Sequence, residues 1–332
     1  MNDPEERQSA RPEPEVLISA VVPVYNEEAV LREFHKRLAA VLASLAVTAE
    51  VIYVNDGSTD RSLAVLQDLQ AGDPRIGIID LSRNFGKEVA LTAGLDHSRG
   101  DAVIVIDADL QDPPELIPEF LRYWKEGYEA VYGRRAARDG ESNLKKFTAY
   151  AFYRFMQNVG RPSIPPDTGD FRLLGRRAVE SLKSFREQHR FMKGLFAWIG
   201  YRQKEVLYLR DRRYAGKTKW NYWRLWNFAL EGITSFTIFP LKIASYFGLI
   251  TAIGAFCSAF YIVYKTLMYG DPVAGYPSLM TVILFLGGVQ LITLGIAGEY
   301  IGRIFNETKR RPLYFVNNYY HSRASEDKSI ER

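Results

Sequence analysis

Two carboxylates, Asp107 and Asp109, stand one residue apart directly after a run of apolar residues. The residues that follow, 110–114, read Leu-Gln-Asp-Pro-Pro, so the backbone must turn there and expose the carboxylates. Carboxylate oxygens suit a hard divalent cation such as Mg²⁺ or Mn²⁺, which is often shared with substrate phosphates. Most isolated Asp-x-Asp pairs are solvated turns. The place of this pair after a buried strand favours a metal and phosphate site.

A second polar cluster, Asn55-Asp56-Gly57-Ser58, follows another apolar run. It has two interpretations: a turn in which Ser58 or Thr59 caps the next helix, and a contact to a nucleotide. Both can hold together. The single cysteine excludes an internal disulfide, and the four scattered histidines lack zinc-type spacing. Any metal must therefore be held by oxygen ligands.

Apolar runs at 16–24, 50–54, 75–81 and 101–106 alternate with segments of helical periodicity. This pattern predicts an α/β domain with an open, mostly parallel sheet and helices on both faces. Ligands of such sheets bind beyond the carboxyl ends of the strands. Polar clusters stand at all four predicted ends: 25–27, 55–58, 82–84 and 107–109. We expect them to converge on one site.

The composition of the 332 residues, 47% hydrophobic and 25% charged, excludes a disordered or fibrous chain. The net charge of +4 is too small to indicate a nucleic-acid partner, and none is predicted. Residues 1–15 are polar and lack the apolar core of a signal peptide. They are predicted to be a flexible tail on a cytoplasmic domain.

Two stretches near the C-terminus, about 243–264 and 277–298, carry no charge over about 22 residues each. That length can cross a hydrocarbon core of roughly 30 Å, so two transmembrane helices are predicted within 241–303. The alternative is a pair of buried helices in a soluble domain. Lys242 precedes the first stretch, and Arg303 and Lys309 follow the second. The positive-inside rule then puts the preceding domain and the tail 304–332 in the cytoplasm, on the same side of a membrane that the chain crosses twice.

Basic and aromatic residues crowd the segment before these stretches. Arg210, Arg212, Arg213, Lys217 and Lys219 surround Gly216, which suits an anionic lipid headgroup; a generic basic patch is the alternative. Three of the five tryptophans follow within 220–226. We interpret 220–240 as an amphipathic helix in the headgroup layer, against the alternative that its aromatics pack on the soluble domain.

Taken together, four motifs resemble glycosyltransferase family 2, specifically its polyprenyl-phosphate branch, which includes dolichol-phosphate mannose synthase. They are Val-Pro-Val-Tyr-Asn-Glu at 22–27, Val-Asn-Asp-Gly-Ser at 54–58, Asn-Phe-Gly-Lys at 84–87 and Asp-Ala-Asp-Leu-Gln-Asp-Pro-Pro-Glu at 107–115. The tracts 167–172 and 190–194 and the two apolar stretches are most similar to bacterial bactoprenol-phosphate glucosyltransferases. The resemblance covers about 16–312 and implies a GT-A nucleotide-sugar-binding fold over 16–219.

The resemblance also implies roles for individual residues. The nucleotide sugar would be held by Pro23, Tyr25, Glu27, Asp56, Lys87 and Asp107. Asp109 and Gln111 would ligate Mg²⁺ or Mn²⁺ on the diphosphate, so Asp109 would serve catalysis. Asp170 matches the position of the catalytic base. Because a lipid monophosphate is already largely ionised at neutral pH, Asp170 could equally orient the acceptor or a metal.

The acceptor phosphate would be contacted by Arg134, Arg172, Arg213, Lys217 and Lys219, and the Arg-x-x-Gly-x-x-Lys spacing of 213–219 resembles the acceptor loop of the family. The implied reaction is inverting transfer of a hexosyl group, glucose being favoured, from a UDP-sugar to undecaprenyl or another polyprenyl phosphate. Alternatives are a GDP-mannose donor and a catalytically silent nucleotide-sugar-binding scaffold. A processive synthase is disfavoured, because it needs more spans and a Gln-x-x-Arg-Trp motif. A homo-oligomer is left open.

Overall fold

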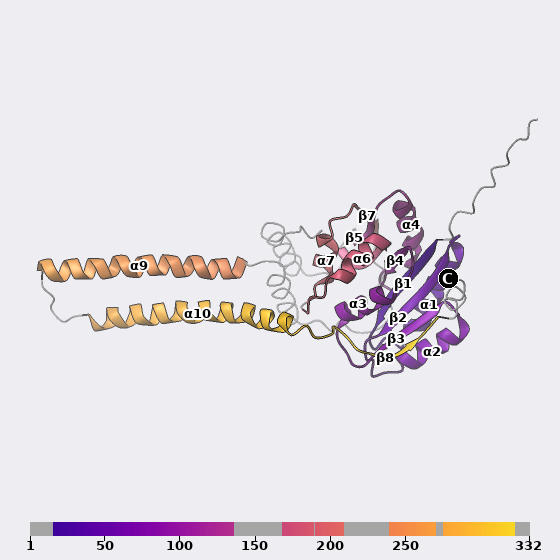
Figure 1. The fold of residues 1–332 in the computed structure, drawn as a ribbon, viewed down its shortest axis with the longest axis horizontal. Helices are drawn as coiled ribbons and strands as arrows, with labels where there is room; N and C mark the ends of the chain where they lie inside the picture. Colours follow the sequence, from indigo (N-terminus) through magenta and orange to yellow (C-terminus); the bar gives the residue numbers. More distant parts are fainter. Residues whose placement is uncertain (1–15, 136–167, 189, 209–238, 270–274, 323–332) are drawn as a thin grey trace, which may run out of the picture.

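The computed structural model describes residues 16–135, 168–188, 190–208, 239–269 and 275–322 as an α/β domain followed by two long helices (Figure 1). Three predicted features lie outside the described residues. These are the tail 1–15, the basic loop that carries Arg213, Lys217 and Lys219, and nearly all of the aromatic segment, up to 238.

The predicted parallel sheet is confirmed. Its strands are β1 (Leu17–Val24), β2 (Thr48–Asn55), β3 (Ile76–Leu81) and β4 (Ala102–Val105), adjacent in the order β3-β2-β1-β4. Successive residues of β1 enter different cores: Val22 lies in the cluster that contains Phe34, and Val21 in the one that contains Leu91. Burial on both faces explains why the strand reads as a continuous apolar run.

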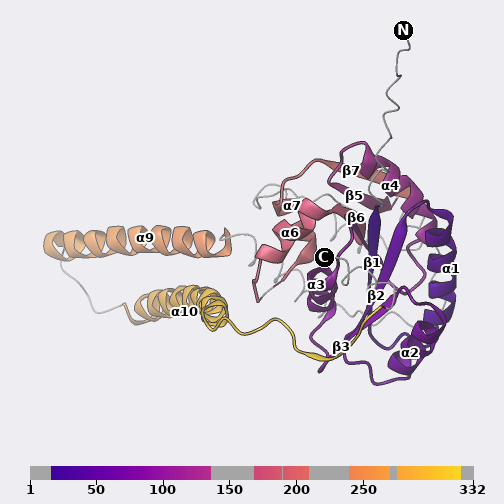
Figure 2. The same cartoon turned by 45° about the vertical axis from the view of Figure 1, so that its right-hand side comes forward.

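Helices cover both faces of the sheet (Figure 2). One face carries α1 (Leu31–Ser44), α2 (Ser62–Gly72) and α4 (Ile117–Lys125), preceded by the short η1 (Pro114–Leu116). The other carries α3 (Lys87–His97), α6 (Arg176–Ser184) and α7 (Met192–Trp198). The first set packs its apolar side on the cluster that contains Phe34, and the second on the cluster that contains Leu91 and on a smaller one around Ile79. The domain therefore has the layered helix–sheet–helix architecture that the periodicity predicted.

The sheet has four further strands, β5 (Ala130–Arg135), β6 (Thr168–Gly175), β7 (Gln203–Tyr208) and β8 (Val316–Tyr320), and its order is β7-β5-β6-β4-β1-β2-β3-β8. β6 runs antiparallel to both β4 and β5. β8 comes from beyond both long helices and pairs antiparallel with β3. The sequence predicted only a tail at that point, because one valine followed by two asparagines and two tyrosines does not show the alternation of a strand.

The order of the strands fixes where a ligand can bind. The chain passes outward from β1 through β2 to β3, and then returns to place β4 on the other side of β1. α1, which follows β1, packs on one face of the sheet, whereas α3, which leads into β4, packs on the other. The strand order therefore reverses between β1 and β4, and ligands of such sheets bind beyond the carboxyl ends of the strands at that point. The predicted site residues at 25–27 and 107–109 stand at those ends.

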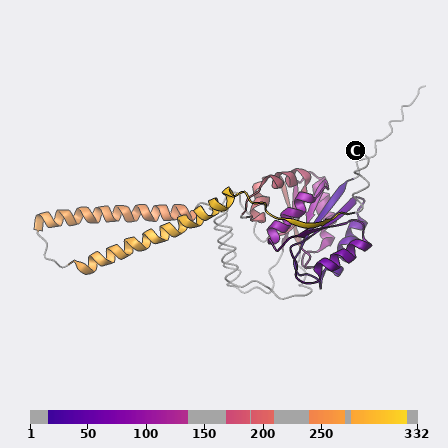
Figure 3. The ribbon, with the colours of Figure 1, turned by 60° about the horizontal axis from the view of Figure 1, so that its bottom comes forward.

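The long helices α9 (Phe239–Tyr269) and α10 (Tyr276–Thr308) form an antiparallel hairpin that projects from the sheet domain (Figures 1 and 3). At 1.5 Å per residue each spans over about 45 Å, more than the roughly 30 Å of a hydrocarbon core. Only 6% of the apolar window Leu241–Ser258 and 0% of Phe285–Thr308 is buried inside the protein. The alternative of two buried helices in a soluble domain is therefore wrong, and both remain candidate membrane spans.

Candidate active site

The ends of β1 and β2 are tied together by side-chain hydrogen bonds. Asn26 has a φ of 55°, a left-handed conformation that asparagine tolerates. Its Oδ1 accepts the amide of Thr59 at 2.8 Å, and its own amide donates to Ser58 Oγ at 3.0 Å. Ser58 therefore does not cap α2, whose N-cap position is Arg61. This arrangement leaves Tyr25 39% exposed at the end of β1, where the family resemblance implies a nucleotide contact together with Pro23 and Glu27.

Asp56 joins this edge to the start of α3. Its buried carboxylate accepts the amides of Phe85 at 2.7 Å and Gly86 at 3.0 Å. Burial raises the pKa of Asp56, and the two amides act in the opposite direction. At Gly57, where φ is 61°, a Cβ would lie 2.5 Å from the carbonyl carbon of Arg83. Only glycine permits this close approach, which holds the loop before Lys87 against the end of β2.

Lys87, Asp107 and Asp170 form one charged cluster, although they come from α3, the end of β4 and β6. Lys87 Nζ donates to Asp107 Oδ2 at 2.7 Å and to Asp170 Oδ2 at 2.5 Å. Burial opposes charge on the lysine, but the two carboxylates raise its pKa overall. Burial raises the pKa of Asp107 to about 6. Burial acts the same way on Asp170, yet Lys87 and Lys193 hold its pKa well below the usual range.

One oxygen of Asp170 has no hydrogen-bond partner among the described residues. The residue is 8% exposed, and among the described residues its Oδ1 is a buried polar atom without a hydrogen bond, while Oδ2 accepts from Lys87. Buried polar atoms are almost always satisfied, because an unmet carboxylate oxygen costs free energy. The free oxygen is therefore suited to a ligand donor or a cation.

Asp109 and Gln111 are held at the same edge by a strained turn. Leu110 between them has a φ of 60°, which is unfavourable for a bulky side chain, and its burial in the core keeps it there. Asp109 Oδ1 accepts the amide of Gln111 at 3.1 Å. Asp112 stabilises the turn, because its Oδ1 accepts a hydrogen bond from Tyr208 Oη at 2.5 Å. The turn presents the oxygens of Asp109 and Gln111, a donor set that fits Mg²⁺ or Mn²⁺.

In the part of the chain that the structure describes, no three His, Cys, Asp or Glu side chains converge as a metal cage. A divalent cation at Asp109 and Gln111 would thus need oxygens of a substrate to complete its shell. That mode of binding, through one or two side chains plus phosphates, is usual for Mg²⁺.

Sequence reasoning assigned no role to Glu88. Its Oε2 accepts the amide of Met192 at 3.0 Å, which links α3 to the start of α7 beside Lys193. Burial, reinforced by the charge of Asp170, raises the pKa of Glu88 to about 7. Two features of the sequence could have indicated a role for Glu88. It directly follows the motif that ends at Lys87, and the motif at 190–194, which it contacts, had been given no role.

The raised pKa of Glu88 predicts a pH dependence of stability. Glu88 has a pKa of 4.5 in the unfolded chain and about 7 in the folded protein, so between these values the folded protein keeps a proton that the unfolded chain has lost. The contribution of Glu88 to the free energy of unfolding is therefore fully present below pH 4.5 and is lost as the pH rises through 7. Glu88→Gln imitates the protonated group, so its melting temperature should exceed that of the parent by a few degrees at pH 8 and match it near pH 5. Thermal melts in detergent measure this. Glu119→Gln, at an exposed helix position, is the control, and an equal gain in both variants at pH 8 would contradict the assignment.

The two described arginines of the predicted acceptor set already make contacts within the protein. The buried Arg172 donates from Nε to the Asp170 carbonyl at 3.2 Å and from Nη2 to the Gly169 carbonyl at 2.9 Å, and it stacks on Phe196. Arg134 pairs with Glu205 at 3.0 Å. Arg172 thus shapes the backbone that carries Asp170. A phosphate contact by either arginine stays a prediction, as it does for Arg213, Lys217 and Lys219 outside the described residues.

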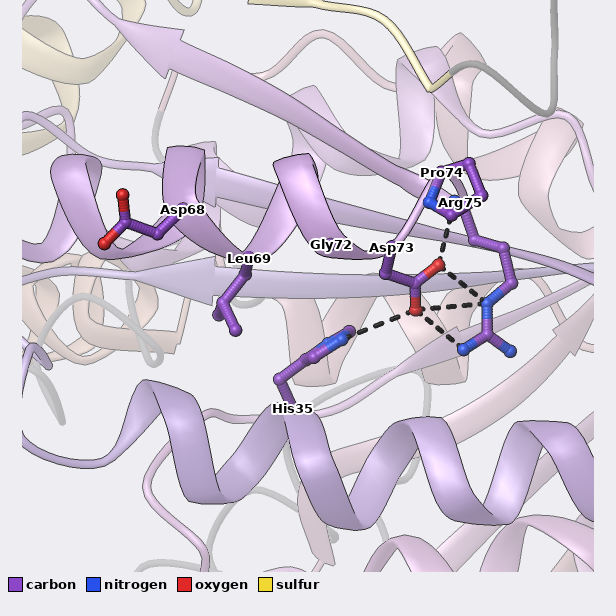
Figure 4. A pocket seen from close by; sticks show the side chains of 7 residues that line it. All are labelled: His35, Asp68, Leu69, Gly72, Asp73, Pro74 and Arg75. Carbon is purple, nitrogen blue, oxygen red and sulfur yellow. Dashed lines mark hydrogen bonds and ion pairs between the residues drawn. The ribbon is translucent and has the colours of Figure 1, made fainter.

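A separate pocket lies between α1 and the residues that directly precede β3, at the amino-terminal ends of the strands (Figure 4). Asp73 there pairs with Arg75 at 2.7 Å and with His35 Nε2 at 3.4 Å. Burial lowers the pKa of His35. Because these groups satisfy one another, and because the amino-terminal ends are opposite to the polar strand ends, we assign the pocket a structural role.

Comparison with known proteins gives two family matches. Residues 19–183 match the model of glycosyl transferase family 2, and residues 239–304 match the GtrB C-terminal hairpin. The first match covers the sheet domain from β1 into α6, and the second covers α9 and most of α10.

Relatives cover nearly the whole chain. An uncharacterized glycosyltransferase of Synechocystis is 53% identical over 91% of this chain and 95% of its own length. A bactoprenol glucosyl transferase of Shigella phage SfV is 46% identical over 91% of this chain and 98% of its own. Among solved structures, glucosyl-3-phosphoglycerate synthase of Mycobacterium tuberculosis, in complex with Mn²⁺ and UDP-glucose, has 20% identity and a TM-score of 0.45 over 66% of this chain and 77% of that one.

Proposed function

The chain belongs to glycosyltransferase family 2, and from this premise we propose that it transfers a glucosyl group from UDP-glucose to undecaprenyl or a related polyprenyl phosphate, with inversion at the anomeric carbon. The observation that carries the proposal is the cluster of Lys87, Asp107 and Asp170 beside the Asp109 turn. Within the described part of the chain, one oxygen of Asp170 in this cluster has no partner. The relatives named bactoprenol glucosyl transferase, 46% identical over 91% of the chain, support the lipid acceptor and the sugar.

In this proposal, the edge formed by Pro23, Tyr25, Glu27 and Asp56 binds the nucleoside of the donor. Asp109 and Gln111 would hold Mg²⁺ or Mn²⁺, which when bound supplies positive charge against the departing diphosphate. The Lys87 ammonium lies between Asp107 and Asp170 and so offsets part of the negative charge with which the two carboxylates would repel an anionic donor. With the metal ion bound, the site would be preorganised for the negative charge that develops on the leaving group.

We assign Asp170 to orienting the acceptor rather than to removing a proton. Its lowered pKa makes the carboxylate a weak base. A lipid monophosphate, with a second pKa near 6, is largely ionised at neutral pH and needs little deprotonation. The phosphate oxygen attacks the anomeric carbon from the face opposite the diphosphate, and UDP leaves. Lys87 and Lys193 would offset repulsion between Asp170 and the incoming phosphate.

The hairpin of α9 and α10 keeps the enzyme where a very apolar acceptor resides. Arg213, Lys217 and Lys219 precede the hairpin in sequence and would bind the acceptor phosphate, with Arg134 and Arg172 as further candidates. The basic residues on both flanks favour a cytoplasmic catalytic domain in a multi-pass inner-membrane protein.

A direct assay tests the proposal. Membranes that contain the protein are incubated with undecaprenyl phosphate and radiolabelled UDP-glucose, other UDP-sugars or GDP-mannose, and transfer into solvent-extractable lipid is counted. We expect label from UDP-glucose only, and background counts with Asp170→Asn. Label from GDP-mannose alone would overturn the donor assignment, and UDP-glucose binding without transfer to any acceptor would indicate a silent scaffold.

The same proposal predicts the topology. Both ends of the hairpin carry positive charge, so the sheet domain and the residues after Arg303 should lie on one, cytoplasmic side. Protease added to inverted inner-membrane vesicles should remove a C-terminal tag, whereas intact spheroplasts should protect it. Cleavage in spheroplasts would contradict the orientation.

A further inference from the structure

After the hairpin of α9 and α10, the chain returns to the sheet domain and packs beside the proposed nucleoside site of Pro23, Tyr25, Glu27 and Asp56, here called the nucleotide edge. Tyr314 Oη donates to Asp96 at 2.9 Å, the amide of Ser82 donates to the Phe315 carbonyl at 3.0 Å, and β8 then pairs with β3. In Figure 1 this segment runs from the base of α10 along the lower edge of the sheet. The polar end of β3 thereby faces a strand from beyond the hairpin.

The pairing of β8 with β3 is irregular at one residue. Asp80 stands opposite Asn318 and Leu81 opposite Val316, so Asn317 is the extra residue of a bulge. Bulges of this kind re-aim a side chain, and they are common at sheet edges next to functional sites. Here Asn317 Nδ2 donates to Asp80 Oδ2 at 2.9 Å.

Asp80 links Asn317 to the nucleotide edge through its second carboxylate oxygen. It is 5% exposed, and its other oxygen, Oδ1, accepts from Asn55 Nδ2 at 2.7 Å. Asn55 Oδ1 in turn accepts the amide of Ser58 at 3.3 Å, and Ser58 Oγ accepts the amide of Asn26 at 3.0 Å. Four hydrogen bonds thus connect β8 to the two loops on which Tyr25 and Asp56 lie.

We propose that Asn317 is a positioning residue for donor binding: from a strand beyond the membrane hairpin, it holds Asp80 and Asn55 so that the 25–27 and 55–58 loops present the nucleotide edge. This inference rests on the proposed function of that edge. Asn317 Nδ2 is the hydrogen-bond donor to Asp80 Oδ2, and a buried carboxylate oxygen that loses its donor must find water or rotate. Rotation of Asp80 would release the Asn55 carboxamide, and with it the 55–58 turn.

The test uses the full chain in detergent with UDP-glucose as the probe. Asn317→Ala should raise the dissociation constant of UDP-glucose, measured by calorimetry, by about tenfold, as expected for the loss of one hydrogen bond to a charged group. The KM for the donor should rise in parallel, while the KM for undecaprenyl phosphate stays within about twofold. Asn318→Ala removes the same side chain from the next position of β8, outside the bulge, and should leave both constants unchanged.

A reciprocal exchange separates positioning from loss of folding. Asn317→Asp alone sets two carboxylates against each other and should weaken UDP-glucose binding more than Asn317→Ala. Combined with Asp80→Asn, it restores one donor and one acceptor and should recover binding. Equal effects of the Asn317 and Asn318 substitutions, or no recovery in the double variant, would overturn the proposal. Failure of the unmodified protein to bind UDP-glucose would instead refute the proposed function.

Discussion

Replacement of Asp109 by alanine should lower kcat/KM for glucosyl transfer by more than about a hundredfold. Asp109 and Gln111 are the proposed cation ligands, and a bound cation contributes several kcal/mol of charge stabilisation at the leaving diphosphate; each 1.4 kcal/mol is tenfold in rate. Removal of the cation from the unmodified protein by a chelator should reproduce the loss, and added Mg²⁺ or Mn²⁺ should reverse it. Initial rates of label transfer into extractable lipid measure both effects.

The turn itself supplies a reason to expect a localised effect. Leu110 stays in its left-handed conformation because its side chain is buried, and Asp112 is anchored independently by Tyr208. Loss of the Asp109 side chain should therefore leave the fold intact. The matched control is Asp68→Ala, which removes an exposed carboxylate paired with Arg32 on the surface. Full transfer activity in chelator would refute the metal hypothesis, whatever the variant does.

Replacement of Lys87 by methionine should lower kcat/KM by about thirtyfold. Removal of one member of a buried, hydrogen-bonded charge pair costs about 2–5 kcal/mol, and because the Lys87 side chain is 41% exposed we use the lower end. Asp107 and Asp170 would then face each other without a cation. The pKa of Asp170, now held low by Lys87, should rise, so the acid limb of the pH–rate profile should move to higher pH.

This pH shift distinguishes the role of Lys87 from simple structural support. Lys87→Arg keeps the charge and should retain the acid limb of the parent even if the rate falls. Lys204→Met removes a lysine that lies over Tyr123 and belongs to β7, an outermost strand of the sheet. It should change neither kcat/KM nor the pH–rate profile. An unshifted acid limb in Lys87→Met, with the rate reduced, would mean that the lysine acts on the donor and not on Asp170.

The sequence alone was sufficient for the parallel half of the sheet and for the hairpin. Strands buried on both faces leave continuous apolar runs, and long apolar helices leave long uncharged stretches, so both are local signals. The site edge followed from the same reasoning, because the polar residues come directly after those runs and the carboxyl ends of parallel strands meet. Asp107, Asp109, Asp56 and Tyr25 were located in this way.

Only the tertiary structure decided which of these groups touch. Asp107 lies 20 residues after Lys87 in the sequence, and Asp170 lies 83 residues after it. Nothing in the local sequence fixes the distances between these three side chains. β8 has no apolar alternation of its own; it is a strand because the edge of β3 offers unpaired backbone groups. Asn317 and Asp80 meet for the same reason. Local patterns determine which elements form, whereas contacts between elements depend on strand order and register, which the chain acquires only when it folds.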